Sequence, residues 1–512
     1  MENIIHSFWS LPSNKDKTTE HDRNNGGFLS EKHHAMSWAL SCLSWKKHYG
    51  RILLFTDIKG KEWLIDKLQL PYDEVNVCLD NINDVNPIYY AYPKLYVYSL
   101  QELPFLHVDG DTYIFNKLPI NYKNSDLICQ SFEYNYSFYG KVLNQVCNNL
   151  KGLPNEIYEY NSANFKAINA GVIGGKNISF FKELFLFVNH IFENNEIKSE
   201  TIDLERYNVL MEQFYFYMLA NKKNLKINRL INTYISENFK ELTQFHLTPY
   251  YNSYIHLISF SKRQYLHYLQ LECRLKKEIP ETFRHINSLY KDFNPQNTFI
   301  TKDNLNHFKL TALLIDDKEN KNIEENKSKI EKFLDETLKD KSSFSLFIYD
   351  LYQIEYFLYR ISTQYSKKIN EKEVYNNISI LYDNMNINEL KFKINENKGE
   401  LIFLNFDYSN FDLINDLEKI VTDYKNLKQT KPSPYFIFVE DDWSDMYIEC
   451  KQLVGWNLLY YYLDGESKNI SDFINIISKS NFLDYEGDNL EYDLTDFLLS
   501  NAVYHSYLKI EI

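Results

Sequence analysis

The sequence Leu103-Pro-Phe-Leu-His-Val-Asp-Gly-Asp-Thr-Tyr-Ile-Phe115 contains a short apolar run that ends abruptly on two aspartates. An apolar run of this length, bounded by a turn residue, predicts a buried strand. Asp109 and Asp111 flank Gly110, which lets the backbone turn, so both carboxylates should lie together where the strand ends. Two close carboxylates repel each other, and a divalent cation commonly holds both ionised. For this tripeptide alone, however, an ordinary acidic turn between two hairpin strands is the more economical interpretation.

The preceding residues favour a ligand site over a simple turn. Residues 51–55 form another apolar run, which stops on Thr56 and Asp57. Apolar strands that alternate with amphipathic helices predict an α/β fold with a covered, largely parallel sheet. In such sheets ligands bind beyond the carboxyl ends of the strands, and Asp109 and Asp111 follow an inferred carboxyl end as well.

Two domains are expected, at residues 1–290 and 291–512. Residues 316–343 are highly charged but still repeat apolar residues at helical spacing, which predicts an exposed helix rather than a linker. Apolar runs predict later strands at residues 400–406, 435–439 and 456–462, with helices near 410–427 and 470–480. The second domain should therefore be a smaller α/β or α+β domain.

Composition narrows the class of protein. The chain has 512 residues and a formal net charge of −14, which disfavours non-specific binding to nucleic acid or anionic membranes. Its six cysteines are scattered, without the spacing of a zinc site, and we expect reduced thiols. We see no signal peptide at the first residues and no apolar run long enough to span a bilayer. A cytoplasmic protein is therefore expected.

Three further segments combine apolar patterns with polar or small residues. Residues 165–175 predict a strand interrupted by small residues, which suits a place where a ligand approaches the backbone. Residues 203–220 predict an amphipathic helix with Glu212 and Gln213 near its middle. Residues 250–262 place His256 at a strand end or in a loop.

The ordered set of these motifs resembles a GT-A glycosyltransferase of the retaining galactosyltransferase and glycogenin-like branch. It is also similar to uncharacterised bacterial proteins of the same plan. The resemblance extends over about residues 1–270 and implies a mixed, Rossmann-like sheet that binds a nucleotide sugar. In chain order its motifs are Thr56-Asp57, Lys94, Asp109-Gly110-Asp111, Asn169-Ala170-Gly171, Glu212-Gln213 and the segment from His256 to Lys262.

The resemblance implies a metal site made by Asp109, Asp111 and His256. His256 and Lys262 have the spacing of the family's His-x-x-Gly-x-x-Lys motif, although Ser259 replaces the glycine. Manganese accepts an imidazole beside carboxylates more readily than magnesium does, so Mn²⁺ is expected before Mg²⁺. Lys262 would place a positive charge on the diphosphate of the donor.

The resemblance also implies roles for residues that contact the donor. Glu212 and Gln213 match the family's Asp-Gln pair, with a longer acid, and would be the catalytic residues facing the anomeric carbon. Asn169 would hydrogen-bond sugar hydroxyls, and Lys94 would reach the sugar or the phosphates. The full donor-binding set comprises Thr56, Asp57, Lys94, Gly110, Asn169, Ala170, Gly171 and Lys262.

The function implied is that of a metal-dependent hexosyltransferase. It would transfer a sugar from a nucleotide sugar, a UDP-sugar by expectation, to an unknown glycan, peptide or small molecule. Transfer with retention is expected; an inverting enzyme would instead use Glu212 as the base. The C-terminal domain would select the acceptor or mediate assembly, and self-association is left open.

Two alternatives are kept. The first is an inactive GT-A-like binding module whose C-terminal domain mediates interactions. The second is a hydrolase or phosphotransferase that uses the same two aspartates. The second is disfavoured because such enzymes usually have a glycine-rich loop after the first strand, and none follows Phe8.

Overall fold

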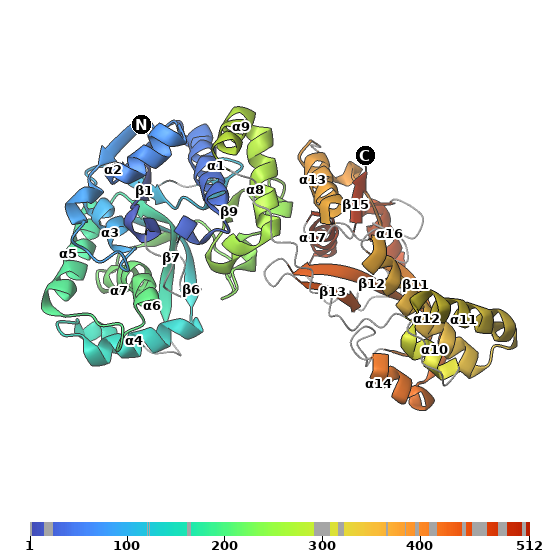
Figure 1. The fold of residues 1–512 in the computed structure, drawn as a ribbon. Helices are drawn as coiled ribbons and strands as arrows, with labels where there is room; N and C mark the ends of the chain where they lie inside the picture. Colours follow the sequence, from blue (N-terminus) through green and yellow to red (C-terminus); the bar gives the residue numbers. More distant parts are fainter. Residues whose placement is uncertain are drawn as a thin grey trace. The chain divides into compact units, whose positions relative to one another are not determined.

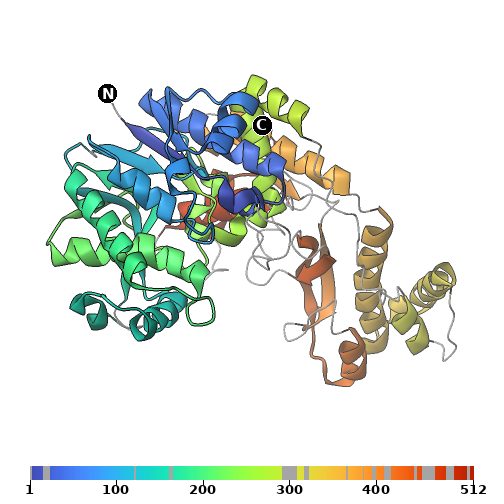
Figure 2. The ribbon, with the colours of Figure 1, turned by 60° about the vertical axis from the view of Figure 1, so that its left-hand side comes forward.

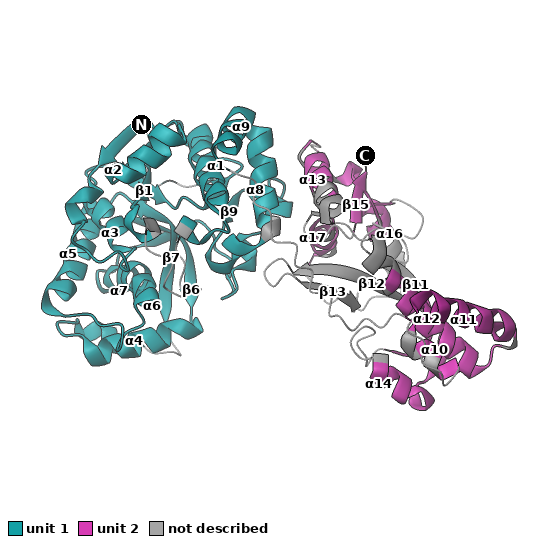
Figure 3. Cartoon of the chain, viewed as in Figure 1, with its two compact units in different colours: residues 1–293 teal, residues 294–512 magenta. Residues whose placement is uncertain are grey.

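The structure is a computed structural model in which the chain divides into two compact units, residues 1–293 and 294–512 (Figure 3). Each unit is described by itself, and their independent folding stays a prediction. The structure describes residues 3–14, 24–119, 121, 123–160, 165–290, 308–315, 322–364, 367–383, 386–394, 399–408, 417–442, 447–452, 468–479, 489–503 and 508–511. Among the helices in these ranges, none combines the length and the apolar character needed to cross a membrane.

The N-terminal unit is built on a seven-stranded mixed sheet with the order β3-β2-β1-β4-β7-β6-β8. Strand β7 runs antiparallel to both of its neighbours, and the other adjacent pairs are parallel. The strands are β1 (Ile4–Phe8), β2 (Ile52–Thr56), β3 (Glu74–Val77), β4 (Phe105–Val108), β6 (Leu127–Tyr134), β7 (Lys166–Gly175) and β8 (Ile227–Arg229). The predicted α/β fold with a mixed sheet is confirmed.

Helices cover both faces of this sheet. Every residue of β4 and of β2 is buried, which requires packing on both sides of the strands. Figure 1 and Figure 2 show helices on either side of the strands in this unit. The helices are α1 (Glu31–Tyr49), α2 (Ile58–Lys61), α3 (Tyr92–Ser99), α4 (Ser137–Asn149), α5 (Ile178–Asn194), α6 (Leu204–Val209), α7 (Tyr215–Lys222), α8 (Tyr265–Glu278) and α9 (Pro280–Leu289).

Helix α5 illustrates how the sequence forms these covering elements. The Asn177 side chain caps its first turn by accepting a hydrogen bond from the amide of Phe180. Its buried residues recur every three or four positions and form one apolar stripe: Phe180, Phe181, Leu184, Val188 and Ile191. The helix packs against α3, which leads into β4 and so supports the strand that precedes Asp109.

The predicted helix over residues 203–220 contains a local irregularity. It consists of α6, a π-helical turn at Leu210–Phe214, and α7. Glu212 and Gln213 lie in the π-helical turn, where the wider winding changes the direction of side chains relative to a regular helix. Turns of this kind occur frequently at functional sites.

The C-terminal unit combines helices with two small antiparallel sheets, as an α+β domain does. One sheet has the order β11-β12-β13 and the other β14-β10-β15. The strands are β10 (Lys391–Ile394), β11 (Gly399–Phe406), β12 (Gln429–Asp442), β13 (Tyr447–Gln452), β14 (Lys468–Asn469) and β15 (Leu508–Glu511). The helices are α10 (Lys309–Ile315), α11 (Ile323–Thr337), α12 (Ser343–Gln364), α13 (Lys367–Asp383), α14 (Leu417–Thr422), α16 (Ile470–Lys479) and α17 (Leu490–Val503).

The sequence-based elements of this unit agree with the structure where the two can be compared. The strands predicted at 400–406 and 435–439 correspond to β11 and to part of β12. Of the helix predicted near 410–427, residues 410–416 lie outside the described residues, and the described part contains α14 and a 3₁₀ turn at Tyr424–Asn426. The strand predicted at 456–462 lies outside the described residues.

Candidate functional site

The Asp-Gly-Asp turn (Asp109–Asp111) does not join the two strands of a hairpin. Strand β4 belongs to the large sheet, whereas β5 (Thr112–Ile114) pairs with β9 (Tyr254–His256) in a separate two-stranded sheet. The hairpin interpretation of this turn is therefore wrong. The β5–β9 register places Thr112 opposite His256, so a residue far along the chain arrives beside the second aspartate.

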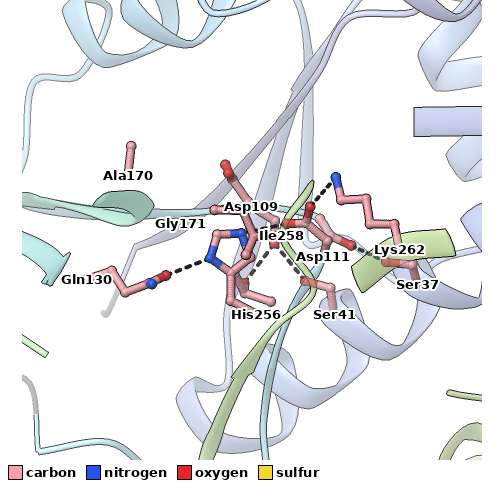
Figure 4. Close-up of polar contacts among 12 residues, drawn as sticks. Ser37, Ser41, Asp109, Asp111, Gln130, Ala170, Gly171, His256, Ile258 and Lys262 are labelled. Carbon is pink, nitrogen blue, oxygen red and sulfur yellow. Dashed lines mark hydrogen bonds and ion pairs between the residues drawn. The ribbon is translucent and has the colours of Figure 1, made fainter. Parts of the chain in front are cut away.

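The structure brings the three predicted metal ligands together. One side-chain oxygen or nitrogen atom from each of Asp109, Asp111 and His256 lies within 4.8 Å of the other two (Figure 4). His256 and Asp111 are buried and Asp109 is partly buried. Because the group follows β4, it lies at the carboxyl edge of the parallel strands, where α/β sheets bind ligands.

The atoms of this group fit a divalent cation. Asp111 Oδ1 is buried and accepts no hydrogen bond from the described residues, and the buried Asp109 Oδ1 is contacted by the ammonium group of Lys94 at 2.7 Å. His256 Nδ1 is 2.8 Å from Gln130 Oε1, so Nδ1 carries the proton and Nε2 is left with a lone pair. That Nε2 faces Asp111 Oδ1 at 3.4 Å, an approach of two acceptors that a cation would make favourable. Imidazole with carboxylates suits several divalent metals, so the chemistry of these atoms does not single one out.

Each aspartate also has a lysine partner. Lys262 Nζ lies 2.5 Å from Asp111 Oδ2. Lys94 Nζ lies 2.7 Å from Asp109 Oδ1 and 3.4 Å from Glu212 Oε1. The two lysines thereby balance most of the negative charge of the site, and Lys94 connects the candidate metal group to Glu212.

The two aspartates have different proton affinities. Burial raises the pKa of Asp109; the nearby Lys94 opposes this shift and the charge of Asp111 adds to it. Burial would also raise the pKa of Asp111, but the charge of Lys262 and its contact with the carboxylate outweigh burial and hold that pKa well below its usual range. Asp111 is therefore the more firmly ionised of the pair.

Helix α1 fixes the Asp-Gly-Asp turn through two hydrogen bonds. The hydroxyl of Ser37 donates to the carbonyl of Gly110 at 2.9 Å, and that of Ser41 donates to the carbonyl of Asp109 at 3.2 Å (Figure 4). The serines are four residues apart, so they lie on one face of the helix. A β-carbon at Gly110 would lie 2.5 Å from the ring of Trp38, which explains why glycine is needed between the aspartates.

The Asn-Ala-Gly segment (Asn169–Gly171) and Gln213 form hydrogen bonds with other residues of the protein. Asn169 Nδ2 donates to Glu133 Oε1 at 2.7 Å, and its Oδ1 accepts from the amide of Gly171 at 3.0 Å. Gln213 Oε1 accepts from the amide of Ala170 at 2.9 Å. These contacts make Asn169 and Gln213 supports of the local backbone.

The side chains of Thr56 and Asp57 also form hydrogen bonds with neighbouring residues of the protein. Thr56 Oγ1 donates to the carbonyl of Phe8 at 2.7 Å. Asp57 Oδ2 accepts from the amide and hydroxyl of Ser10, and its Oδ1 accepts from the amide of Gly60. The two residues tie the ends of β1 and β2 together and cap α2, so they shape the edge of the sheet.

Several residues of the site were not anticipated from the sequence. Gln130 orients His256, Glu133 binds Asn169, and Tyr98 donates a 2.8 Å hydrogen bond to Glu212 Oε1. The sequence offered a signal for the first two, because Gln130 and Glu133 are large polar residues within a largely apolar strand.

Residues 1–289 match a protein family described as "Family of unknown function (DUF6734)". The chain belongs to this family. The DUF6734 match spans nearly the whole N-terminal unit, and with it every residue of the candidate site. A comparison with curated proteins finds no significant match to the sequence. Among solved structures, the apo form of mouse xyloside xylosyltransferase 1 is similar at 10% identity, covering 50% of this chain and 97% of that chain, with a TM-score of 0.27.

Proposed function

We propose that the N-terminal unit is a metal-dependent glycosyltransferase that takes a sugar from a nucleotide-sugar donor. The observation that supports this most directly is the group formed by Asp109, Asp111 and His256, with Lys262 beside it, at the carboxyl edge of a mixed α/β sheet. The expected donor is a UDP-sugar, and the resemblance of the motifs to the retaining GT-A branch favours transfer with retention.

The residues around the group suit departure of a diphosphate. A bound divalent cation would act as a Lewis acid on the diphosphate oxygens. Lys262 would add a second positive charge there, since its ammonium group lies at the same aspartate. Lys94 holds Asp109 and Glu212 at fixed distances from each other through its two ion pairs.

In this proposal Glu212 would stabilise positive charge at the anomeric carbon. Its carboxylate is held by Tyr98 and by Lys94, so its position is fixed before a substrate binds. Burial raises the pKa of Glu212; Lys94 opposes that shift and Asp109 adds to it. We assign Glu212 the electrostatic role and Gln213 a supporting role.

A metal-independent binding module is the second candidate. The observation in its favour is that Lys262 and Lys94 already neutralise Asp111 and Asp109 without a cation. In that case the function of the protein would depend on interactions that the C-terminal unit makes with binding partners. In the leading proposal, that unit selects the acceptor or mediates assembly.

Isothermal titration with UDP, with and without MnCl₂ or MgCl₂, distinguishes the two candidates. The glycosyltransferase proposal expects UDP binding that depends on the metal, with Mn²⁺ more effective than Mg²⁺. It also expects Mn²⁺-dependent hydrolysis of at least one member of a panel of UDP- and GDP-sugars. UDP binding that is absent, or unaffected by either metal, together with no hydrolysis, would reject it in favour of the binding module.

A further inference from the structure

Strand β7 contains a bulge beside the candidate metal group. In its pairing with β6, Cys129 is opposite Ile173, but the next pair joins Ser131 to Asn169. One residue of β6 therefore faces three residues of β7, which include Ala170 and Gly171. A bulge of this kind leaves backbone groups without their ladder partners, and buried groups of that sort need other partners.

Two side-chain amides satisfy the backbone of the bulge. Gln213 Oε1 accepts from the amide of Ala170 at 2.9 Å. Asn169 Oδ1 accepts from the amide of Gly171 at 3.0 Å. Asn169 belongs to β7 itself, whereas Gln213 comes from the π-helical turn. The bulge is therefore hydrogen-bonded both within its own strand and to a separate helical element.

Both amides converge on the carboxylate of Glu133. Its Oε1 accepts from Asn169 Nδ2 at 2.7 Å, and its Oε2 accepts from Gln213 Nε2 at 3.2 Å and from the hydroxyl of Tyr139 at 2.5 Å. Glu133 is only 2% exposed. A carboxylate can accept all three hydrogen bonds, whereas an amide in its place would direct its own N–H groups at a donor.

The bulge contacts the candidate metal group directly. The carbonyl of Gly171 accepts from the amide of Asp109 at 3.0 Å. A β-carbon at Gly171 would lie 2.5 Å from the ring of His256 and 2.3 Å from Gln130 Oε1 (Figure 4). The same network holds Gln213, whose chain neighbour is Glu212. The bulge and the turn bearing Glu212 are thus fixed together beside the metal group.

We propose that Glu133 is a positioning residue that fixes the Asn169–Gly171 bulge and the turn bearing Glu212 as the surface that receives the donor sugar. This inference rests on the proposed function. In a nucleotide sugar the hexose is attached to the diphosphate, so it would lie next to the metal group. Among the described residues, Glu133 hydrogen-bonds Asn169, Gln213 and Tyr139 and none of the three candidate metal ligands, so its effect should fall on the sugar and not on the nucleotide diphosphate.

The test compares UDP with UDP-sugars in the full-length protein. Dissociation constants for UDP and for UDP-glucose, UDP-galactose, UDP-xylose and UDP-N-acetylglucosamine are measured with MnCl₂ for wild type, Glu133→Gln and Glu133→Ala. Glu237→Gln is the matched control, since Glu237 is an exposed carboxylate that hydrogen-bonds Ser137 at the start of the helix bearing Tyr139. Circular dichroism verifies folding, and Glu133→Gln decides the outcome if the alanine variant does not fold.

The expected result is a loss of preference for the sugar. In both Glu133 variants the affinity for the best UDP-sugar, relative to UDP, should fall about 10-fold or more, as is typical of residues that orient ligand-binding groups. UDP affinity and the control variant should be unchanged. Equal changes for UDP and UDP-sugar, or no change, would overturn the inference and leave the proposed function intact. If the wild type binds UDP with Mn²⁺ but prefers no UDP-sugar over UDP, the inference is overturned and the proposed function is left intact. If the wild type shows no metal-dependent binding, the inference and the proposed function are both overturned.

Discussion

Gln130 fixes the proton of His256 on the ring nitrogen that points away from the aspartates. The 2.8 Å contact between His256 Nδ1 and Gln130 Oε1 leaves Nε2 free to face Asp111. Gln130 belongs to the large sheet and His256 to the small one, so this hydrogen bond also connects the two sheets. The orientation of the candidate metal ligand thus depends on a residue far from it in the sequence.

Replacing Gln130 with leucine should weaken metal binding. Without the acceptor for Nδ1, His256 can take the other tautomer or rotate, and Mn²⁺ affinity should fall about 10–100-fold. Titration of Mn²⁺ followed by electron paramagnetic resonance measures the change. The matched control is Gln101→Leu, which replaces another buried glutamine, one whose side-chain N–H donates to the carbonyl of Val97. Equal affinities in wild type and Gln130→Leu would contradict the orienting role.

Asp111→Asn should remove Mn²⁺-dependent UDP binding. The change takes away one carboxylate of the candidate group and leaves Lys262 without its partner at 2.5 Å. Loss of this partly buried ion pair should lower the free energy of unfolding by about 1–2 kcal/mol, because relief of repulsion from Asp109 offsets part of the loss. Calorimetric titration and urea unfolding measure the two effects. Binding that persists in the variant would exclude Asp111 as a ligand.

Ser259 adopts the backbone conformation that a glycine would supply. Its φ of 54° lies in the left-handed region, and its side chain is exposed. Ser259→Gly should therefore keep metal-dependent binding and leave stability unchanged or slightly higher. Ser259→Val should lower stability by about 1–2 kcal/mol, because a β-branched residue tolerates positive φ poorly. Thermal unfolding of both variants decides the matter, and equal stabilities would show that φ is not positive.

Stability should depend on pH through Glu133. Burial raises the pKa of Glu133 from 4.5 to about 7, with hydrogen bonds from Tyr139, Asn169 and Gln213 opposing the shift. Because the folded state holds the proton more tightly, the stabilising contribution is complete below about pH 4.5 and is lost as the pH rises through about 7. The full loss over this range is about 3 kcal/mol.

The measurement is urea unfolding of wild type and Glu133→Gln across this pH range. The free energy of unfolding of wild type, minus that of the variant, should fall between about pH 4.5 and 7. Subtraction removes the contributions of other groups that titrate in both proteins. A difference that stays constant with pH would show that the carboxyl group of Glu133 does not titrate in this window.

The N-terminal unit should fold without the C-terminal one. Residues 1–293 contain the whole mixed sheet, its helices and the candidate site. A truncated protein of these residues should unfold cooperatively and retain Mn²⁺-dependent UDP binding. Full-length protein is the control. Limited proteolysis that yields no stable fragment of about half the mass would contradict independent folding.

Local pattern was enough to predict most elements, because apolar runs and helical spacing report burial directly. The run before Asp109 predicted β4, and polar residues after it indicated where a ligand would bind. The partner of β5 was beyond such reasoning, since pairing with β9 depends on contacts far apart in sequence. His256 was identified by resemblance to a family motif. The π-helical turn at Leu210–Phe214 was not predicted. The small residues in 165–175 indicated an interrupted strand but not the bulge, whose backbone is hydrogen-bonded in part by Gln213 from a distant helical turn.

The lysine partners of the two aspartates have a consequence for the order of binding. A cation that approaches Asp109 and Asp111 meets the positive charges of Lys94 and Lys262, so the metal alone gains little electrostatic energy. A diphosphate reverses this balance, because it attracts both the cation and Lys262. Metal and nucleotide should therefore bind cooperatively, and by thermodynamic linkage each must raise the affinity of the other by the same factor. Under the proposed function, the two lysines would make the site bind the metal and the nucleotide together in preference to either one alone.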